Sequence, residues 1–271
     1  MSAQPDTCAL CPRLCRHRCP IAVATGLESV TPTAIMSTII MARHDEHTPV
    51  GQAIDLCTRC GQCEAACGVD QPVIAVLDAA RVTHQNPMPP WEPPQIDGNE
   101  DHVAILCSGT DWTEAFERRH QIKLSRLTTH DHLGELHFIR PDTKPALLQK
   151  LKETLGDKTA ITTSNTCLAT LLEAGCHALH ISHFMGEENQ TPRWRTCQCK
   201  PGPGVRTDVH CCGARAPLIT SHPKVAQMVA DDLRRRLDGQ AVYIEDSRCA
   251  AHLKAAGTQV VDPIDRLSTT E

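Results

Sequence analysis

The N-terminal part of the chain holds two cysteine-rich runs, CALCPRLCRHRCP at residues 8–20 and CTRCGQCEAACG at residues 57–68. The first run has the spacing C-x2-C-x3-C-x3-C, and the second has C-x2-C-x2-C-x3-C. Three closely spaced cysteines on one turn of chain can bind one iron–sulfur cluster, with a fourth cysteine supplied from elsewhere. The two runs therefore predict two [4Fe–4S] clusters and a role in electron transfer.

The last cysteine of each run is expected to bind the cluster of the other run, as happens in two-cluster ferredoxins. Pro20 fits this arrangement, because a proline after the last cysteine turns the chain away from the cluster. Gly68 stands where a second such proline is expected, and the extra residue between Cys11 and Cys15 leaves open whether Cys15 is the third ligand. The expected ligands are Cys8, Cys11, Cys15 and Cys67 for the first cluster, and Cys57, Cys60, Cys63 and Cys19 for the second.

Structural zinc is the alternative reading of these runs. Four-cysteine zinc sites use two C-x2-C pairs separated by a longer loop. They do not need three or four cysteines within one turn of chain, so the spacing favours iron–sulfur clusters.

Composition narrows the class of protein. The net charge of −5 and the aromatic content of 3% argue against nucleic-acid binding, which uses basic surfaces and aromatic stacking. The N-terminus has no apolar core of signal-peptide type, and the longest apolar stretch, residues 34–42, is too short to span a bilayer. We therefore expect a cytoplasmic protein whose 16 cysteines are metal ligands or redox groups rather than disulfides.

The chain divides into three parts, and the expected fold class is α+β and multidomain. Residues 1–85 form a mostly helical two-cluster domain, in which Thr31 and Pro32 start a helix with an apolar face and residues 51–56 form a second helix. Residues 86–100 contain five prolines and are expected to form a linker. Residues 101–271 are expected to form an α/β domain.

Strand-like and helical patterns alternate in this third part, which predicts a parallel or mixed sheet. Strands are expected at residues 103–107, 135–139, 160–163, 205–210, 241–245 and 259–261. Helices are expected at residues 144–155, 167–174, 223–237 and 248–256.

A second group of cysteines lies in the C-terminal half. The adjacent pair Cys211 and Cys212 can present two thiolates to one metal centre, and Gly213 permits close approach of the backbone. Together with Cys249, the CCG motif resembles the cysteine-rich CCG domain of heterodisulfide reductase B-type subunits and of glycolate- and lactate-oxidation iron–sulfur subunits. The N-terminal part resembles the helical two-cluster ferredoxin of heterodisulfide reductase C-type subunits, so the resemblance covers nearly the whole chain.

The resemblance implies a third metal site with ligands Cys199, Cys211, Cys212 and Cys249. Two departures from the family pattern bear on it. The first of two expected repeats, with Cys107 and Cys167, has no adjacent cysteine pair, so it is interpreted as a degenerate repeat in which both cysteines are buried small hydrophobic residues. The second repeat has His252 where a last cysteine is expected. The upstream ligand stays open among Cys176, Cys197 and Cys199, and His210 and His252 are further candidates as ligands or proton donors. An iron–sulfur cluster, zinc, or reactive thiols without metal all remain open at this site.

These observations lead to an expected function. By resemblance, the chain is a non-catalytic electron-transfer subunit of an oxidoreductase complex, a hetero-oligomer in which a flavin dehydrogenase or an electron-transfer flavoprotein is the partner. No catalytic residue is assigned. Two alternatives are a catalytic subunit that reduces a disulfide or a quinone at the CCG motif, and a zinc-stabilised scaffold without a redox role.

Overall fold

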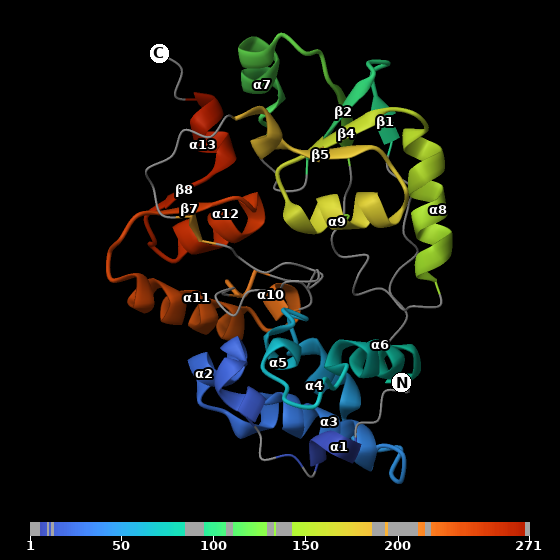
Figure 1. Cartoon of the computed structure of the whole chain (residues 1–271), viewed down its shortest axis with the longest axis vertical. Helices are drawn as coiled ribbons and strands as arrows, with labels where there is room; N and C mark the ends of the chain where they lie inside the picture. The colour runs from blue at the N-terminus through green and yellow to red at the C-terminus, as the bar shows by residue number, and fades with distance from the viewer. Residues whose placement is uncertain are drawn as a thin grey trace. The chain divides into compact units, whose positions relative to one another are not determined.

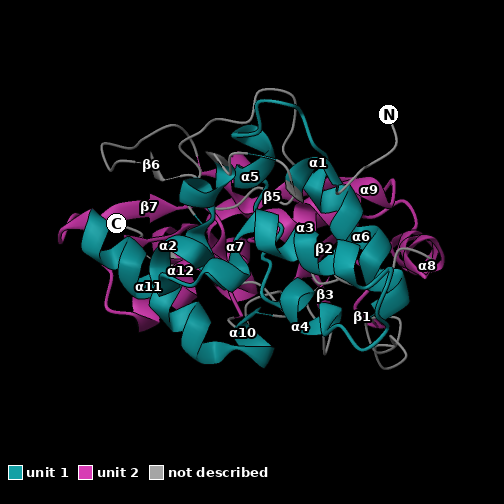
Figure 2. Ribbon diagram, turned by 90° about the horizontal axis from the view of Figure 1, so that it is seen from below, with its two compact units in different colours: residues 1–87, 140–142, 197–236 teal, residues 88–139, 143–196, 237–271 magenta. Residues whose placement is uncertain are grey.

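The computed structural model describes residues 6–9, 11, 14–84, 95–106, 111–128, 133, 143–185, 193–194, 211–214 and 218–268. The chain forms two compact units, which Figure 2 colours separately. Unit 1 contains residues 1–87, 140–142 and 197–236, and unit 2 contains residues 88–139, 143–196 and 237–271. Residues 197–236 cluster with the N-terminal part, whereas the sequence predicts one α/β domain over residues 101–271, and that domain division stays a prediction.

The described part of unit 1 is helical (Figure 1). Its short helices in the first half are α1 (Asp6–Ala9), η1 (Leu14–Arg18), α2 (Pro20–Thr25), η2 (Glu28–Val30), α4 (Val50–Asp55) and α5 (Gln62–Ala65). The longer helices there are α3 (Pro32–Met41) and α6 (Val73–His84). Helices α10 (Leu218–Ser221) and α11 (Pro223–Leu237) come from the C-terminal half, and α11 extends into unit 2 by its last residue.

Helix α3 shows why the local sequence folds as it does. The Thr31 hydroxyl accepts a hydrogen bond from the backbone N–H of Ala34 at 3.3 Å, and Pro32 occupies the first turn, as predicted. The buried side chains of Ile35, Met36 and Ile39 then face one apolar cluster. Helix α6, which the sequence reasoning missed, packs on the same cluster through Val73, Val76, Leu77 and Ala80. Its signal was the helical spacing of these four residues.

A second apolar cluster explains why residues 218–236 belong to unit 1. Ile21 and Ala22 of α2 and Val30 of η2 are buried together with Leu218 of α10 and with Ala226 and Val229 of α11. The apolar face of α11 is therefore covered by the N-terminal helices, and this contact fixes its place in unit 1.

Unit 2 is built on a sheet of order β1-β3-β2-β4-β5. Strands β2 (His102–Ile105), β3 (Ser125–Thr128), β4 (Thr159–Thr162) and β5 (Ala178–His180) are parallel, and β1 (Gln95–Asp97) pairs antiparallel with β3. A second, parallel sheet has the order β6-β7-β8, with β6 (Arg193–Trp194), β7 (Val242–Ile244) and β8 (Val260–Val261). The prediction of a parallel or mixed sheet is confirmed. Within the predicted linker 86–100, Gln95–Asp97 form an edge strand that pairs with β3.

Helices cover both faces of the larger sheet. Side chains alternate between the faces along a strand, so Val103 and Ile105 pack with α8 (Lys144–Leu155) and α9 (Asn165–Glu173) on one face. Ala104 and Ile161 pack on the other face with α7 (Thr113–His120), η4 (Ile181–Phe184) and α13 (Pro263–Ser268). Helix α12 (Ser247–Ala255) packs beside β7 and β8.

Most of the predicted helices and strands that fall within the described residues are present in the structure. Helices α8 and α11 have the predicted bounds, and α4, α9 and α12 lie within two residues of prediction at each end. Helix α7 and strands β3 and β5 were missed, and the predicted strands at residues 135–139 and 205–210 lie outside the described residues. Among the described residues, no helix has the length and apolar composition needed to cross a bilayer.

Candidate metal centres

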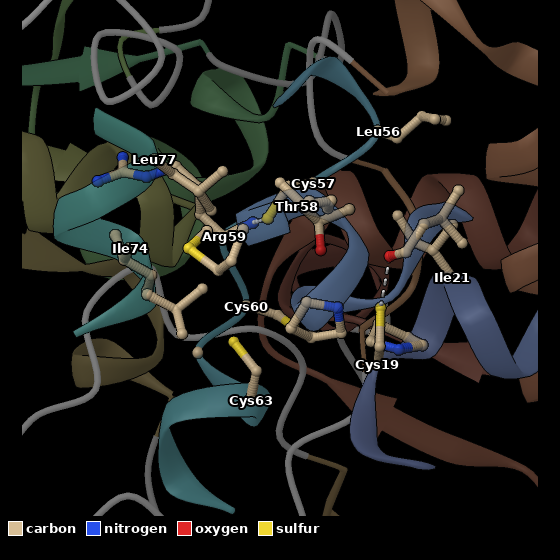
Figure 3. A pocket seen from close by; sticks show the side chains of 17 residues that line it. Cys19, Ile21, Leu56, Cys57, Thr58, Arg59, Cys60, Cys63, Ile74 and Leu77 are labelled. Carbon is tan, nitrogen blue, oxygen red and sulfur yellow. Dashed lines mark hydrogen bonds between the residues drawn. The ribbon is translucent and has the colours of Figure 1, made fainter. Parts of the chain in front are cut away.

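Four thiols line one cavity in unit 1 (Figure 3). Cys57, Cys60 and Cys63 come from the second cysteine run, and Cys19 is the last cysteine of the first run. The rest of the lining is mostly apolar, with Ile21, Val30, Ile35, Met36, Leu56 and Leu77 among the contributing residues. This set of donors, soft thiolates in an apolar enclosure, fits an iron–sulfur cluster.

Local backbone geometry brings these thiols together. Arg59 (φ +53°) and Gly61 (φ +77°) both adopt the left-handed conformation, which curls the chain between Cys57 and Cys63 around one point. Cys19 directly precedes α2, where Pro20 starts the helix and leads the chain away. The expected role of Pro20, turning the chain away from a cluster, stays a prediction with which this position is consistent.

Burial raises the pKa values of Cys19, Cys57 and Cys63 in this cavity. It raises the pKa of Cys19 to about 12, with further contributions from the thiolates of Cys60 and Cys57. The pKa of Cys63 lies well above its usual value for the same reason, burial first and neighbouring thiolates next. Burial thus favours the protonated form of Cys19 and Cys63, and metal binding must release those protons.

A second group of four thiols gathers Cys8, Cys11, Cys15 and Cys67. Burial raises the pKa of Cys8 to about 11, followed by repulsion from Cys15, Cys67 and Cys11 in that order. Burial also raises the pKa of Cys15, and Cys11 and Cys67 add to this while a hydrogen bond with Thr33 opposes it. Cys8 therefore interacts electrostatically with the other three cysteines that the sequence assigns to the first cluster, and this ligand set stays a prediction.

Backbone N–H groups point at sulfur atoms in both groups. The N–H of Arg59 donates to Cys57 Sγ at 3.4 Å, and the N–H of Gln71 donates to Cys67 Sγ at 3.3 Å. Such hydrogen bonds stabilise negative charge on sulfur and are one of the means by which a protein adjusts an iron–sulfur cluster.

A buried charge cluster beside Cys57 was missed at the sequence level. Asp78 of α6 accepts hydrogen bonds from Arg59 Nη2 at 2.5 Å and from Arg81 Nη1 at 3.0 Å. The Arg81 side chain is 0% exposed. Burial raises the pKa of Cys57, and the Arg81 guanidinium is the largest electrostatic influence that opposes this rise. The only sequence signal was a charged D-x2-R pair, Asp78 and Arg81, on the apolar helix α6.

Comparison with known families bears on these two groups of thiols. Residues 4–70 match the 4Fe-4S dicluster domain. The match includes all eight cysteines of the two runs and covers about a quarter of the chain. It supports an iron–sulfur protein and 4Fe–4S binding within this dicluster segment. No curated protein and no solved structure matches the chain.

The Cys211–Cys212 pair lies in the same unit as the dicluster segment. Both side chains are buried, and the Cys211 thiol donates a hydrogen bond to Thr58 Oγ1 at 3.4 Å. Thr58 directly follows Cys57, so the pair packs against the loop that carries three thiols of the cavity. Gly213 adopts φ +83°, and a side-chain Cβ there would come within 2.8 Å of the carbonyl oxygen of Ala226 in α11. The glycine of the CCG motif therefore permits this close approach.

The other expected ligands of the third site have different places. Cys249 is buried in α12, which belongs to unit 2, and His252 is half-buried on the same helix. Cys176 is buried in the apolar cluster of the larger sheet. Cys107, Cys197, Cys199 and His210 lie outside the described residues.

Cys167 corrects one expectation. It is 0% exposed in the apolar cluster of unit 2, as expected of a buried small residue, but it is disulfide-bonded. The other described cysteines are free thiols. The expectation that cysteines are ligands or redox groups rather than disulfides is therefore wrong for this one.

Cys167 and Cys249 occupy equivalent positions in two strand–helix–strand segments, β4–α9–β5 and β7–α12–β8. Each cysteine N–H donates to the side chain that caps its own helix, Ser164 at 3.5 Å and Asp246 at 3.0 Å. Asp246 Oδ2 also accepts from the Ser164 hydroxyl and the Asn165 N–H, both at 2.9 Å. The two helix N-termini therefore share one buried carboxylate.

Proposed function

We propose that this chain is an electron-transfer subunit that binds two [4Fe–4S] clusters and passes single electrons between a flavoprotein partner and another acceptor. One observation carries the proposal. Cys19 of the first run lines one cavity with Cys57, Cys60 and Cys63 of the second run. Cys8 of the first run interacts electrostatically with Cys67 of the second, as well as with Cys15 and Cys11. The proposed ligands are Cys8, Cys11, Cys15 and Cys67 for the first cluster, and Cys19, Cys57, Cys60 and Cys63 for the second.

The exchange of one ligand between the runs has a physical consequence. Each cluster is tied to both runs, so the two clusters are held within one small helical unit. Iron–sulfur clusters suit the proposed role because oxidation of a reduced flavin yields two electrons that can leave one at a time. The chain itself binds, orients and buries the clusters, and its N–H groups and charges adjust their reduction potentials.

The CCG pair extends the proposal to a third centre. The resemblance stated above places Cys199 and Cys249 with Cys211 and Cys212 as its ligands. The hydrogen bond from Cys211 to Thr58 supports this extension, because it puts a thiol against the loop of the second group. Zinc at these cysteines, or direct reduction of a disulfide or quinone there, are the competing assignments.

Metal analysis of anaerobically purified protein tests the proposal. About eight iron and eight sulfide ions per chain are expected for two clusters, and about twelve of each for three. Zinc with no iron would refute the electron-transfer role. Purification of the native complex provides the partner test, in which a flavoprotein should co-purify and reduce the clusters when its substrate is added.

A further inference from the structure

The buried charge cluster of unit 1 joins Arg59, Asp78 and Arg81. Asp78 bridges both guanidinium groups through its two carboxylate oxygens, at 2.5 Å to Arg59 and 3.0 Å to Arg81. The exposed fractions of the side chains are 9% for Arg59 and 0% for Arg81. Two buried or nearly buried cations thus face one carboxylate here.

This charge lies against the second group of thiols. Arg59 lines the cavity, and its N–H donates to Cys57 Sγ at 3.4 Å. Arg81 interacts electrostatically with the Cys57 thiolate. Charges buried in this way are poorly screened by salt, so they act on a neighbouring group more strongly than surface charges do.

The first group of thiols has no comparable neighbour among the described residues. Arg59 and Arg81 are the only buried arginine or lysine side chains in the part of the chain that the structure describes. The charges that act on Cys8 are those of the other three cysteines of its group. Glu64 acts against the arginines, because its carboxylate interacts electrostatically with both Cys63 and Arg59. It is less buried than Arg81 and accepts a hydrogen bond from the Ile74 N–H at 2.7 Å.

We propose that Arg59 and Arg81, held in place by Asp78, raise the reduction potential of the second cluster above that of the first. The inference rests on the proposed function and adds to it the direction of electron transfer between the two clusters. Reduction adds one negative charge to a cluster, and buried cations favour the form with more negative charge. In protein that has received one electron, that electron then resides on the cluster held by Cys19, Cys57, Cys60 and Cys63.

In electron transfer between the clusters, the first cluster loses one electron and the second gains it, so no further oxidant or reductant is required. Electrons therefore run downhill from the Cys8 group to the Cys57 group. The loop that carries the Cys57 group is also the one that touches Cys211 through Thr58. The charge cluster thus directs electrons towards the side of the dicluster segment where the CCG pair lies.

Two substitutions with opposite effects test the inference in the holoprotein. Arg81→Gln removes a cation and should make the potential of the second cluster more negative. Asp78→Asn removes the carboxylate that offsets the arginines and should make it more positive. A tenfold change in the equilibrium between the clusters corresponds to 59 mV for one electron, and we expect at least this shift in each direction. Arg81→Lys keeps the charge and should stay closer to wild type than Arg81→Gln.

The measurement is a redox titration followed by electron paramagnetic resonance, with iron and sulfide counted in each sample. Arg43→Gln is the matched control, since Arg43 pairs with Asp6 at an exposed position near the first run. A Cys11→Ser background, which lacks one first-cluster ligand, identifies the remaining signal as that of the second cluster.

The outcomes separate this inference from the proposed function. Protein without iron refutes the proposed function, and the charge inference falls with it. Fully loaded protein in which Arg81→Gln and Asp78→Asn leave both potentials unchanged, or move one in the same direction, overturns the charge inference alone. If the Arg81→Gln protein does not bind its clusters, the reduction potentials of the Asp78→Asn and Arg81→Lys proteins test the inference by the same criteria.

Discussion

Cysteines of the two thiol groups have different surroundings from cysteines in the core of unit 2. Cys60 lines the apolar cavity with three other cysteines, whereas Cys176 is a buried thiol in the core of unit 2. Cys60→Ser is expected to lower the iron content by about four ions per chain, because one cluster loses a ligand. Cys176→Ser is the matched control and should retain full iron. Equal iron in the two variants would contradict the proposed ligand set.

His180 gives a residue-level prediction about pH. Burial lowers its pKa, and Glu245 partly opposes this. The unfolded chain therefore binds the proton more tightly, so the stability that neutral His180 provides is present above about pH 6.5 and is lost as the pH falls through that value towards the lower folded-state pKa. His180→Gln should lose less free energy of unfolding than wild type between about pH 7.5 and pH 5.5, as measured by urea denaturation at each pH.

The exposed His177→Gln is the control for that experiment and should keep the wild-type dependence on pH. A His180→Gln variant with the wild-type pH dependence would show that this imidazole does not contribute to it.

The sequence predicts those residues whose role depends on neighbours in the chain. The Thr31 cap of α3 and the place of Pro20 at the start of α2 follow from residue type and local order. The pairing of Arg59 with Asp78 could not be predicted, because charged residues are usually exposed and nothing local indicates that two arginines turn inward. The disulfide bond of Cys167 was missed for a similar reason, since such a bond depends on tertiary contact.

At the scale of elements, the turn after the CCG pair gives a paired test. Gly213 and Gly239 both adopt positive φ, +83° and +75°. A Cβ at Gly213 would also meet the backbone oxygen of Ala226 at 2.8 Å, whereas nothing lies within 4 Å of one at Gly239. Gly239→Ala should cost about 1 kcal/mol from backbone strain alone, and Gly213→Ala about 2–4 kcal/mol because overpacking adds to it.

Thermal denaturation followed by circular dichroism measures this difference. Equal losses in the two variants would mean that α11 shifts freely and that the close approach at Gly213 is not required.

The carboxylate that the N-termini of α9 and α12 share is predicted to contribute strongly to the stability of unit 2. Asp246 is 3% exposed, and its carboxylate accepts from the N-termini of both helices. Asp246→Ala removes the cap of α12 and the acceptor of the Asn165 N–H at the start of α9. It also leaves the buried Ser164 hydroxyl without its acceptor, and the total cost should be about 3–4 kcal/mol. The exposed Asp45→Ala, which removes hydrogen bonds to His47 and Thr48, should cost about 0.5–1 kcal/mol.

Urea denaturation followed by tryptophan fluorescence reports on Asp246→Ala, since the buried Trp112 lies in unit 2. A loss no greater than that of Asp45→Ala would rule out the shared cap as a major contribution.

Helices with strong apolar spacing and recognisable ends, such as α8 and α11, could be predicted with their bounds. Strands β3 and β5 could not, because each contains one large apolar residue, Leu127 or Leu179, whereas the predicted strands β2 and β7 contain two or more. The edge strand β1 was not predicted, because the prolines in residues 87–94 just before it favoured a linker.

At the scale of the whole molecule, the two units should respond differently to loss of metal. Cys8, Cys57 and Cys63 pack against the main apolar cluster of unit 1, and Cys19 packs against the second one. The core of the larger sheet in unit 2 contains only Cys167 and Cys176 among the described cysteines. Removing the clusters with a chelator under reducing conditions should therefore lower amide protection in α2, α3, α6 and α11 and leave β2 and β4 protected.

Hydrogen exchange with mass spectrometry, compared between loaded and metal-free protein, checks this expectation. Loss of protection in β2 and β4 equal to that in α3 would mean that unit 2 also depends on the clusters for its fold.

The order of a helical N-terminal part followed by a mixed helix-and-sheet part could be predicted from the sequence. The assignment of residues 197–236 to unit 1 could not, because the apolar face of α11 does not reveal which surface it will cover. The partner of an amphipathic helix is fixed by tertiary packing.

The contact between α2 and α11 limits how the electron-carrying module can be excised or grafted. A gene truncated after residue 87 would still encode all eight cysteines of the two runs, yet Ile21, Ala22 and Val30 would lose the side chains that cover them. Such a fragment would expose an apolar surface and is a poor choice for a stand-alone electron carrier. A transplant into another scaffold has to carry residues 1–87 and 197–236 together, since the module is discontinuous in sequence.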